Sequence, residues 1–187
     1  MEGVTLIRSL KIYPDAELLR QAEPVVEFDQ ALVDLGEEMI ETCRRYDTAL
    51  GLAAPQLGIN KRIVVFQENT DLHTYRVLVN PSWTSTSEDA EMFDGIEGCL
   101  SFPGLQVKVC RYAAINVHAM TTNREPQLFC AVGLQARILQ HECDHLEGIM
   151  IVDHMPKVSR SITFSRFIKA RAKARRQVRA HLREQPA

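Results

Sequence analysis

The sequence predicts an α+β fold in which antiparallel β-sheets pack around a central helix that carries an HExxH motif, with a further helix towards each end of the chain. Three patterns support this class. Short β-type segments follow one another through short, turn-rich connections, which is typical of antiparallel sheets rather than of repeated β-α-β units. A helix within residues 134–146 is apolar around most of its circumference, so we expect other elements to cover it. A long amphipathic helix precedes the β-type segments, and a basic helix follows them.

The first predicted helix begins after Asp29, whose side chain can cap it, and ends near residues 46–47. Its apolar residues recur at helical spacing, so one face packs inward. These residues are Leu32, Leu35, Met39, Ile40 and Cys43. The next segment, Gly51-Leu-Ala-Ala-Pro-Gln56, is expected to form an apolar loop, because Pro55 is unsuited to a regular helix.

Five short strands are predicted after this loop. Turn-rich segments separate them, among them Asn80-Pro81 and residues 121–126. The predicted strands cover residues 62–67, 76–80, 106–109, 114–118 and 127–131.

The central helix is expected to run from about Leu134 to Leu146, and Gly148 stands where a C-cap glycine is expected. Because the helix is predicted to be buried, the histidines inside it need partners. A third helix, which begins near Ser159 or Ser161, carries a basic tail.

The charge distribution divides the chain into two parts. The 187 residues fit one domain, with residues 1–156 as the predicted catalytic domain and residues 157–187 as a tail that is not an independent domain. The tail holds ten basic residues and one acidic residue, although the formal net charge of the whole chain is only −2. An acidic body with a basic tail indicates a polyanionic partner for the tail, and it argues against free DNA as a partner of the whole surface.

Several classes of protein are excluded by composition. Unbroken apolar stretches such as residues 63–66 and 149–152 are too short to span a bilayer, so we expect no membrane partner. The N-terminal segment reads neither as a signal peptide, because Arg8 and Lys11 interrupt it, nor as a transit peptide, because it is acidic. The chain has five cysteines, an odd number that favours reduced thiols and a cytoplasmic location.

The strongest chemical signal is the motif His141-Glu142-Cys143-Asp144-His145. Positions i and i+4 of a helix share one face, so both imidazoles can bind one metal ion, and Glu142 can reach a water on that ion as a base. The alternative is a chance HExxH whose histidines are hydrogen-bonded in a core. Placement in a buried, capped helix favours the metal site.

The third ligand must come from upstream of this helix. A metzincin would need histidine where Ile151 stands, and a thermolysin-like site would need a downstream glutamate, for which only Glu184 is available. Cys99, in Glu97-Gly98-Cys99-Leu100-Ser101, is the best upstream ligand, because glycine lets the backbone approach a site closely. A lone cysteine is nevertheless more often a small buried apolar residue.

The other cysteines compete with Cys99 for the role of ligand. Cys143 lies off the histidine face of the helix and is expected to point away from a metal. The remaining three occupy ordinary helix or strand patterns, and they are Cys43, Cys110 and Cys130.

Three motifs together resemble the peptide deformylase family, which removes the N-formyl group from newly made polypeptides. They are Gly51-Leu-Ala-Ala-Pro-Gln56, Glu97-Gly-Cys-Leu-Ser101 and Gln140-His-Glu-Cys-Asp-His-Leu146, in the order and at about the spacing seen in that family. The resemblance covers most of residues 1–155. It implies an amide hydrolase that acts on N-formylmethionine at the start of nascent polypeptides and releases formate.

The resemblance also implies the site. Cys99, His141 and His145 would bind one divalent metal with a water in the fourth position, and Glu142 would act as general base. The Leu100 backbone N–H and the Gln56 side-chain amide would help the metal to hold the oxyanion. Family likeness favours Fe²⁺ as the working ion; Zn²⁺, Ni²⁺ and Co²⁺ also suit one thiolate and two imidazoles. A ferrous site of this kind should be sensitive to oxygen at Cys99.

Further residues are implied for substrate binding. Gly51 would contact the peptide backbone, and Glu97, which resembles a carboxylate paired with Arg111, is placed beside the substrate. Three apolar residues would line the pocket for the first side chain, where a flexible methionine fits well. These residues are Leu50, Leu134 and Ile138.

Alternatives to a standard deformylase remain open at this point. A metallopeptidase is disfavoured because the downstream ligand is missing. Ala49 stands where the family commonly has glycine, which allows an altered substrate preference; a non-catalytic protein that binds formyl-peptides or ribosomes is a further alternative. The basic tail suits ribosomal RNA. Removal of the chain after Met155 is then expected to weaken ribosome binding and to leave turnover of short peptides nearly intact.

Overall fold

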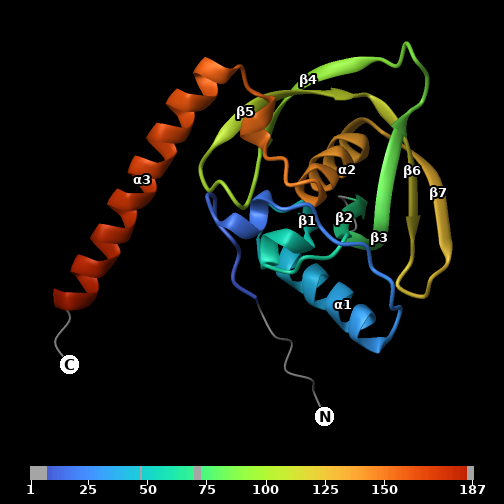
Figure 1. The fold of residues 1–187 in the computed structure, drawn as a ribbon, viewed down its shortest axis with the longest axis horizontal. Coiled ribbons are helices and arrows are strands. Elements are labelled where there is room, and N and C mark those ends of the chain that lie inside the picture. The colour runs from blue at the N-terminus through green and yellow to red at the C-terminus, as the bar shows by residue number, and fades with distance from the viewer. Residues whose placement is uncertain (1–7, 47, 70–72, 185–187) are drawn as a thin grey trace.

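The computed structural model describes residues 8–46, 48–69 and 73–184, with side chains described as far as residue 173 except that of residue 69. It confirms the α+β class with antiparallel sheets and three α-helices. Strands surround helix α2, helix α1 lies on the opposite side of β2 and β3, and helix α3 extends along one flank (Figure 1). The helices are α1 (Gln30–Arg44), α2 (Gly133–Leu146) and α3 (Lys157–Glu184), with short 3-10 turns η1 (Ala16–Leu19), η2 (Ala54–Leu57) and η3 (Ile151–His154).

All strand pairs between these elements are antiparallel. Five strands form one sheet in the order β1-β2-β3-β6-β7, and β4 pairs with β5 as a separate two-stranded sheet. Their bounds are β1 (Gly51–Ala53), β2 (Ile63–Asn69), β3 (Thr74–Ser85), β4 (Met92–Gly98), β5 (Gln106–Tyr112), β6 (Ala114–Met120) and β7 (Pro126–Val132).

The core on the α2 side joins this helix to the large sheet. Leu139 and Leu146 of α2 pack with Phe66, Leu78 and Val117, and all five are buried. A second core lies between α1 and the other face of β2, and it includes Met39, Cys43, Ile63 and Val65. Burial of α2 among strands confirms the prediction made from its apolar circumference.

The ends of both body helices follow the expected cap chemistry. The Asp29 side chain accepts a hydrogen bond from the Leu32 N–H at 3.0 Å, which begins α1 as predicted. Gly148 follows α2 with φ +72°, and a Cβ there would lie 2.8 Å from the backbone of Leu19. This position therefore needs glycine for two reasons, its backbone angle and its contact with η1.

Some predicted boundaries are wrong. The segment expected to be a loop forms strand β1 and then turn η2, in which Pro55 occupies the first turn, where no N–H donor is needed. Strand β3 continues through the predicted turn at Asn80-Pro81, because Asn80 takes φ +52° and the register shifts there. The Asn80 side chain bonds the backbone of Val25 in both directions, at 2.8 Å each.

Other corrections concern elements that were missed or misplaced. Strand β4 was not predicted, because Asp94, Gly95 and Glu97 are residue types depleted in strands, and it forms by pairing along its whole length with β5. Strand β5 extends beyond the predicted end to Tyr112. Helix α1 ends at Arg44, and α3 begins at Lys157 rather than near Ser159.

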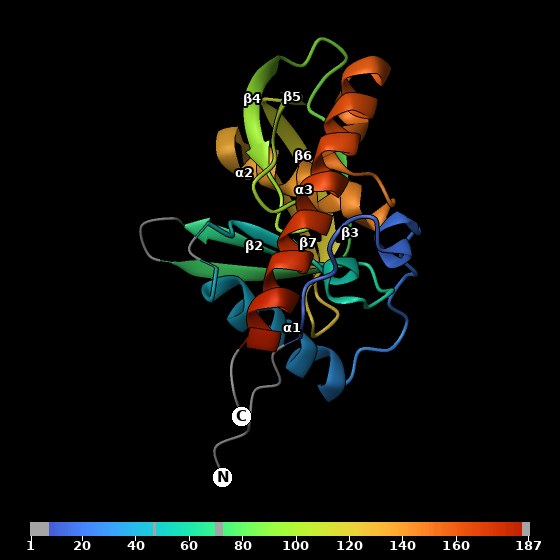
Figure 2. The same ribbon diagram turned by 90° about the vertical axis from the view of Figure 1, so that its left-hand side faces the viewer.

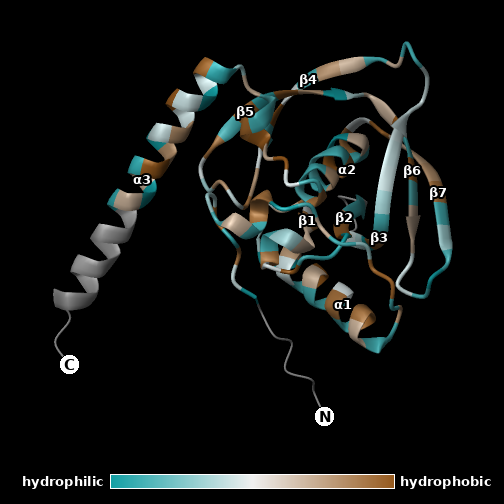
Figure 3. Cartoon of the chain, in the orientation of Figure 1, coloured by the Kyte–Doolittle hydropathy of each residue, from teal (hydrophilic) through white to brown (hydrophobic). Residues whose placement is uncertain are grey.

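Helix α3 leaves the body after η3 and lies across the face of the body that Figure 2 turns towards the viewer. Hydrophilic and hydrophobic segments alternate along the part of α3 whose side chains are described (Figure 3). Among the helices that the structure describes, none is both long and apolar enough to cross a membrane.

Candidate metal centre and active site

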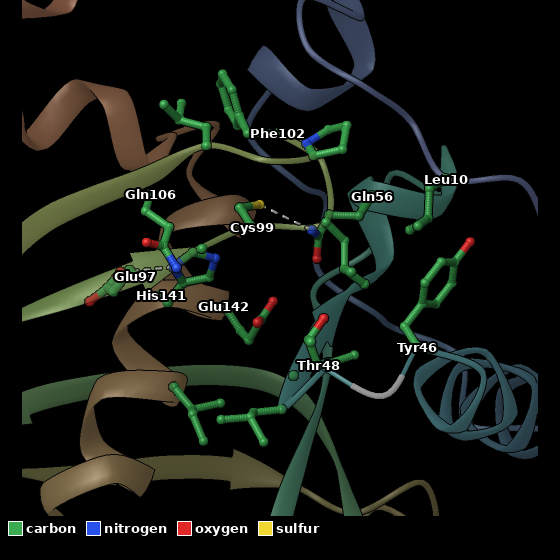
Figure 4. Close-up of a pocket in the computed structure, with 18 of the residues that line it drawn as sticks. Leu10, Tyr46, Thr48, Gln56, Glu97, Cys99, Phe102, Gln106, His141 and Glu142 are labelled. Carbon is green, nitrogen blue, oxygen red and sulfur yellow. Dashed lines mark hydrogen bonds and ion pairs between the residues drawn. The ribbon is translucent and has the colours of Figure 1, made fainter. Parts of the chain in front are cut away.

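A cleft of about 920 Å³ opens between α2, β1 and the loop that follows β4. Helix α2 supplies its floor with His141 and Glu142, η2 supplies Gln56, and the end of β4 supplies Glu97 (Figure 4). The three motifs that lie far apart in the sequence therefore meet in one cavity.

The predicted metal ligands come together at this floor. One donor atom each from Cys99, His141 and His145 lies within 4.8 Å of the other two, and the Cys99 Sγ is 3.3 Å from the His145 Nε2. The helical spacing of the histidines brings their rings to a centroid distance of 5.0 Å. One sulfur and two imidazoles match the donor set of a transition metal with an open coordination position, so the residues fit such an ion.

The charges around Cys99 favour its thiolate, which is the form that binds a metal. Burial alone raises the pKa of Cys99, but the charge of His145 and hydrogen bonds with both histidines lower that pKa well below its usual value. The pKa of His141 is raised well above its usual value, because hydrogen bonds with Cys99 and Glu97 outweigh burial. These surroundings therefore favour the thiolate form of Cys99 over the thiol.

The other cysteines do not share this environment. Burial raises the pKa of Cys143 to about 12, and burial likewise raises the pKa of Cys43, so both remain thiols. Cys143 lies outside the group of metal donors, as its place on the helix predicted. Cys110 and Cys130 are exposed on strands.

Glu97 lies behind His141 in a network of buried charges. Arg111 bonds both of its oxygens, from Nε to Oε1 at 3.0 Å and from Nη2 to Oε2 at 3.1 Å, which confirms the expected pair. The His141 Nδ1 lies 2.9 Å from Oε2. Burial raises the pKa of Glu97, but hydrogen bonds from His141 and Arg111 outweigh it and lower the pKa to about 2. A permanent carboxylate here makes Nδ1–H the donor and leaves the His141 Nε2 for a metal.

Arg137 is a member of this network that sequence reasoning missed. Its Nη1 donates to Glu97 Oε1 at 2.6 Å and to the Val109 carbonyl at 3.0 Å, and its guanidinium lies 4.4 Å from the ring centre of Phe93. A Cβ at Gly95 would lie 2.6 Å from the Arg137 guanidinium carbon, so glycine makes room for it. A signal was present in the sequence, because an arginine inside a buried helix requires a buried partner.

Arg111 extends the network away from the cleft. Its Nη1 donates to Asp144 Oδ2 at 2.6 Å, and the same oxygen lies 2.7 Å from the His154 Nε2. The fourth residue of the HExxH motif therefore anchors the arginine that orients Glu97. It does not point at the metal donors.

Glu142 has a different environment on the other side of His141 (Figure 4). Its side chain is buried, and its Oε2 has no hydrogen-bond partner in the described part of the chain. Burial raises its pKa to about 7, against the lowering effect of His141 and His145. Backbone of β1 packs against it, since a Cβ at Gly51 would lie 2.6 Å from Glu142 Oε1.

The Gln56 amide is held in one orientation. Its Oε1 accepts a hydrogen bond from the Ala53 N–H at 2.9 Å, and its Nε2 faces the Cys99 Sγ at 3.5 Å and the Ser101 Oγ at 3.3 Å. The amide donor is therefore directed at the metal centre. Leu100 lines the cleft beside Cys99.

The three predicted pocket residues all line the cleft: Leu134 and Ile138 from α2, and Leu50 from the position before β1. Ile138 is buried, whereas Leu134 is half exposed at the mouth. Ala49 packs into the core beside α1, and positive φ at described non-glycine residues is confined to His73, Asn80 and Arg124. The loop at Ala49 thus has a backbone conformation open to alanine.

Matches to known proteins agree with this geometry. The family model described as polypeptide deformylase matches residues 7–161. A peptide deformylase of Natranaerobius thermophilus is 40% identical over 154 residues, which cover 82% of this chain and 96% of that protein. One of Rhizobium meliloti is 37% identical over 167 residues, which cover 88% and 94%. The crystal structure of a peptide deformylase from Legionella pneumophila superposes with a TM-score of 0.81 at 34% identity, covering 91% of this chain and 99% of that one.

Proposed function

We propose a catalytic role for each residue of the site, on the premise that this chain belongs to the polypeptide deformylase family. The chain is a metal-dependent hydrolase that removes the N-formyl group from N-formylmethionine at the start of nascent polypeptides and releases formate. The family match favours this activity over peptide-bond cleavage and over binding without turnover. The observation that carries the assignment of roles is the meeting of Cys99, His141 and His145 beside Gln56 and Glu142.

The metal would be held by Cys99, His141 and His145. When bound there, a divalent ion supplies Lewis acidity towards a water and the formyl oxygen. Fe²⁺ is the proposed working ion, and Zn²⁺, Ni²⁺ and Co²⁺ suit the same donors. Replacement Cys99→Ala should abolish stoichiometric metal binding. Full metal content in that variant would mean that the third ligand is another residue.

Glu142 is the general base and then the general acid. It takes a proton from the attacking water as the water oxygen bonds to the formyl carbon, and it delivers that proton to the amine nitrogen as the C–N bond breaks. The products are formate and the free peptide amine. A pKa near 7 suits a group that must accept and return a proton near neutral pH.

Gln56 and Leu100 stabilise the negative charge that develops on the formyl oxygen. The Gln56 Nε2 and the Leu100 backbone N–H are the proposed donors. The bond from Ala53 to Gln56 Oε1 fixes the amide before substrate arrives, so little reorganisation is needed. Loss of one such donor typically lowers a rate by about 10²–10³.

The substrate's methionine side chain is proposed to enter between Leu50, Leu134 and Ile138, while Gly51 meets the peptide backbone. Glu97 lines the same cleft, but Arg111, Arg137 and His141 engage both of its oxygens. We therefore propose that Glu97 affects turnover by orienting His141, and that it does not contact the peptide.

The basic tail is proposed to contact ribosomal RNA, which would bring the enzyme to its substrate in the cytoplasm. The support is charge, since residues 157–187 carry ten basic residues and one acidic residue. Binding should weaken steeply as salt rises, and a chain ending at Met155, which lacks the tail, should bind ribosomes less well. Equal ribosome affinity of the full chain and of the chain ending at Met155 at every salt concentration would exclude the tail as the contact.

The activity is tested by formate release from an N-formylmethionyl tripeptide, using anaerobically prepared protein of known metal content. We expect stoichiometric formate and free tripeptide from the wild type, and neither from the matched variant Glu142→Gln. Cleavage of the peptide bonds with the formyl group retained would instead identify a metallopeptidase.

A further inference from the structure

Residues 11–13 join the two parts of the site that carry the proposed oxyanion donors. The Lys11 N–H donates to the Gln56 carbonyl at 2.7 Å, and the Tyr13 N–H donates to the Ser101 carbonyl at 3.0 Å. Residues 11–13 thus tie turn η2 to the loop that follows Cys99. The separation between the Gln56 amide and the Leu100 N–H depends on this segment, because it is bonded to both sides.

Helix α3 holds the segment from outside through one charged side chain. The Arg171 Nη1 donates to the carbonyls of Ile12 at 3.1 Å and of Tyr13 at 2.5 Å. These carbonyls belong to the same short stretch whose N–H groups bond the site. A guanidinium donor makes stronger hydrogen bonds than a neutral one, so Arg171 restrains the stretch effectively.

Aromatic rings make a second link between α3 and the metal centre. Phe167 lies 5.1 Å from Phe102, ring centre to ring centre, and Phe102 stacks on Tyr13 at 4.7 Å. Phe102 is fully buried, and its N–H donates to the Cys99 carbonyl at 2.9 Å. Phe164 adds an edge contact to Tyr13 at 5.3 Å. The described face of α3 therefore packs into the cluster that contains the metal ligand Cys99.

We propose that Arg171 and Phe167 of α3 are positioning residues for deformylation, which act by fixing residues 11–13 and Phe102 and thereby the Gln56 and Leu100 donors. The inference rests on the oxyanion role proposed for those donors. It makes the first half of α3 part of the catalytic unit, whereas charge alone led us to expect that removal of the chain after Met155 leaves short-peptide turnover nearly intact.

The test compares Arg171→Met with Arg166→Met in the full-length, metal-loaded enzyme. Arg166 is exposed on a different face of the same helix, so its variant controls for loss of one charge. We expect Arg171→Met to lower kcat about tenfold, the factor that corresponds to loss of one charge-assisted hydrogen bond. KM and metal content should change less than about twofold, because those donors act on the transition state rather than on the bound substrate. Arg166→Met should match the wild type.

Amide hydrogen exchange gives a readout that is independent of turnover. The amides of Lys11 and Tyr13 should exchange about tenfold faster in Arg171→Met than in the wild type or in Arg166→Met, and Arg171→Lys should restore most of both exchange protection and kcat. Unchanged kcat together with faster exchange would overturn the positioning role, and unchanged exchange would overturn the restraint itself.

Two truncations keep the proposal testable if Arg171→Met folds poorly. A chain ending at Lys173 retains Arg171 and Phe167 and should keep the wild-type kcat, whereas a chain ending at Met155 should lose kcat at least as much as Arg171→Met. Equal kcat of both truncated chains would overturn the inference. Full activity of Gln56→Ala would instead overturn the oxyanion role on which it rests.

Discussion

Glu97 and Glu142 are two buried glutamates on either side of His141, and their surroundings give them opposite acidities (Figure 4). Hydrogen bonds from His141 and Arg111 overcome burial at Glu97 and lower its pKa to about 2. Burial raises the pKa of Glu142 to about 7. The same side chain is thus a fixed anion in one place and a group that exchanges protons near neutral pH in the other.

This difference shows how one site can assign the orientation of His141 to one glutamate and proton transfer to the other. Both Glu97 oxygens have partners, which suits a group that only orients His141. Glu142 keeps one oxygen without a partner in the described part of the chain, which suits a group that must bind and release a proton. Each substitution below removes one side of this comparison.

The largest effect is expected from Glu142→Gln. The amide has nearly the same shape but cannot accept the proton of the attacking water, so turnover should fall by about 10²–10⁴. Metal content should remain that of the wild type, because Glu142 is not among the three donors. Formate release and metal analysis on one preparation measure both quantities; residual turnover within tenfold of the wild type would remove Glu142 from its role.

Glu97→Gln should affect stability and metal binding instead. Two buried arginines, Arg111 and Arg137, would lose their shared anion, which lowers the free energy of unfolding by about 3–5 kcal/mol. Metal affinity should fall about 10–100-fold, because His141 loses the partner of its Nδ1. The matched control is Glu147→Gln, whose exposed pair with Arg62 is worth about 1 kcal/mol or less. Urea unfolding and metal titration distinguish the two variants.

The two glutamates should also give the metal-free protein opposite dependences of stability on pH. The pKa of Glu142 is higher in the folded chain, so its contribution is fully present below pH 4.5 and is lost as the pH rises through about 7. Glu97 has the reverse sign, with a contribution present above pH 4.5 that is lost as the pH falls through about 2.

Unfolding of metal-free Glu142→Gln from pH 5 to pH 8 measures the first of these contributions. The variant should gain on the wild type as the pH rises, by an amount on the order of 3 kcal/mol above pH 7. Parallel stability curves for the two proteins would show that Glu142 ionises there as an ordinary glutamate.

The smallest effects are expected at two glycines, one beside each glutamate. A Cβ at Gly51 would lie 2.6 Å from Glu142 Oε1, and a Cβ at Gly95 would lie 2.6 Å from the guanidinium carbon of Arg137. Each alanine variant should lose about 1–3 kcal/mol by overpacking. Gly51→Ala should lower kcat while metal binding persists, and Gly95→Ala should mainly weaken metal affinity. The same kinetic signature in both variants would contradict the separation.

The sequence predicted the candidate metal ligands better than the residues and elements that hold those ligands in place. The HExxH spacing and the segment around Cys99 are local signals. The family resemblance then predicted that Gln56 belongs to the same site. The role of Arg137 and the existence of strand β4 were not predicted, because each depends on a tertiary partner. Arg137 is held by Glu97, and β4 pairs along its whole length with β5. The packing of α3 against the body was not predicted either, because the sequence gives the charge of the tail but not the contact of Phe167 with Phe102.

The acidities could not be read from the sequence either. Glu97 and Glu142 each precede or follow a metal-ligand position closely, and nothing local distinguishes them. Their pKa values depend on which arginines the fold brings to one of them and not to the other.

Metal affinity and formate release, measured on the same anaerobic preparations of Glu97→Gln and Glu142→Gln, test the division of roles most directly. We predict that Glu142→Gln binds one metal ion per chain with wild-type affinity and releases almost no formate. Glu97→Gln should bind metal weakly and recover turnover as the metal concentration is raised. Weak metal binding by Glu142→Gln, or inactivity of Glu97→Gln at saturating metal, would contradict the account.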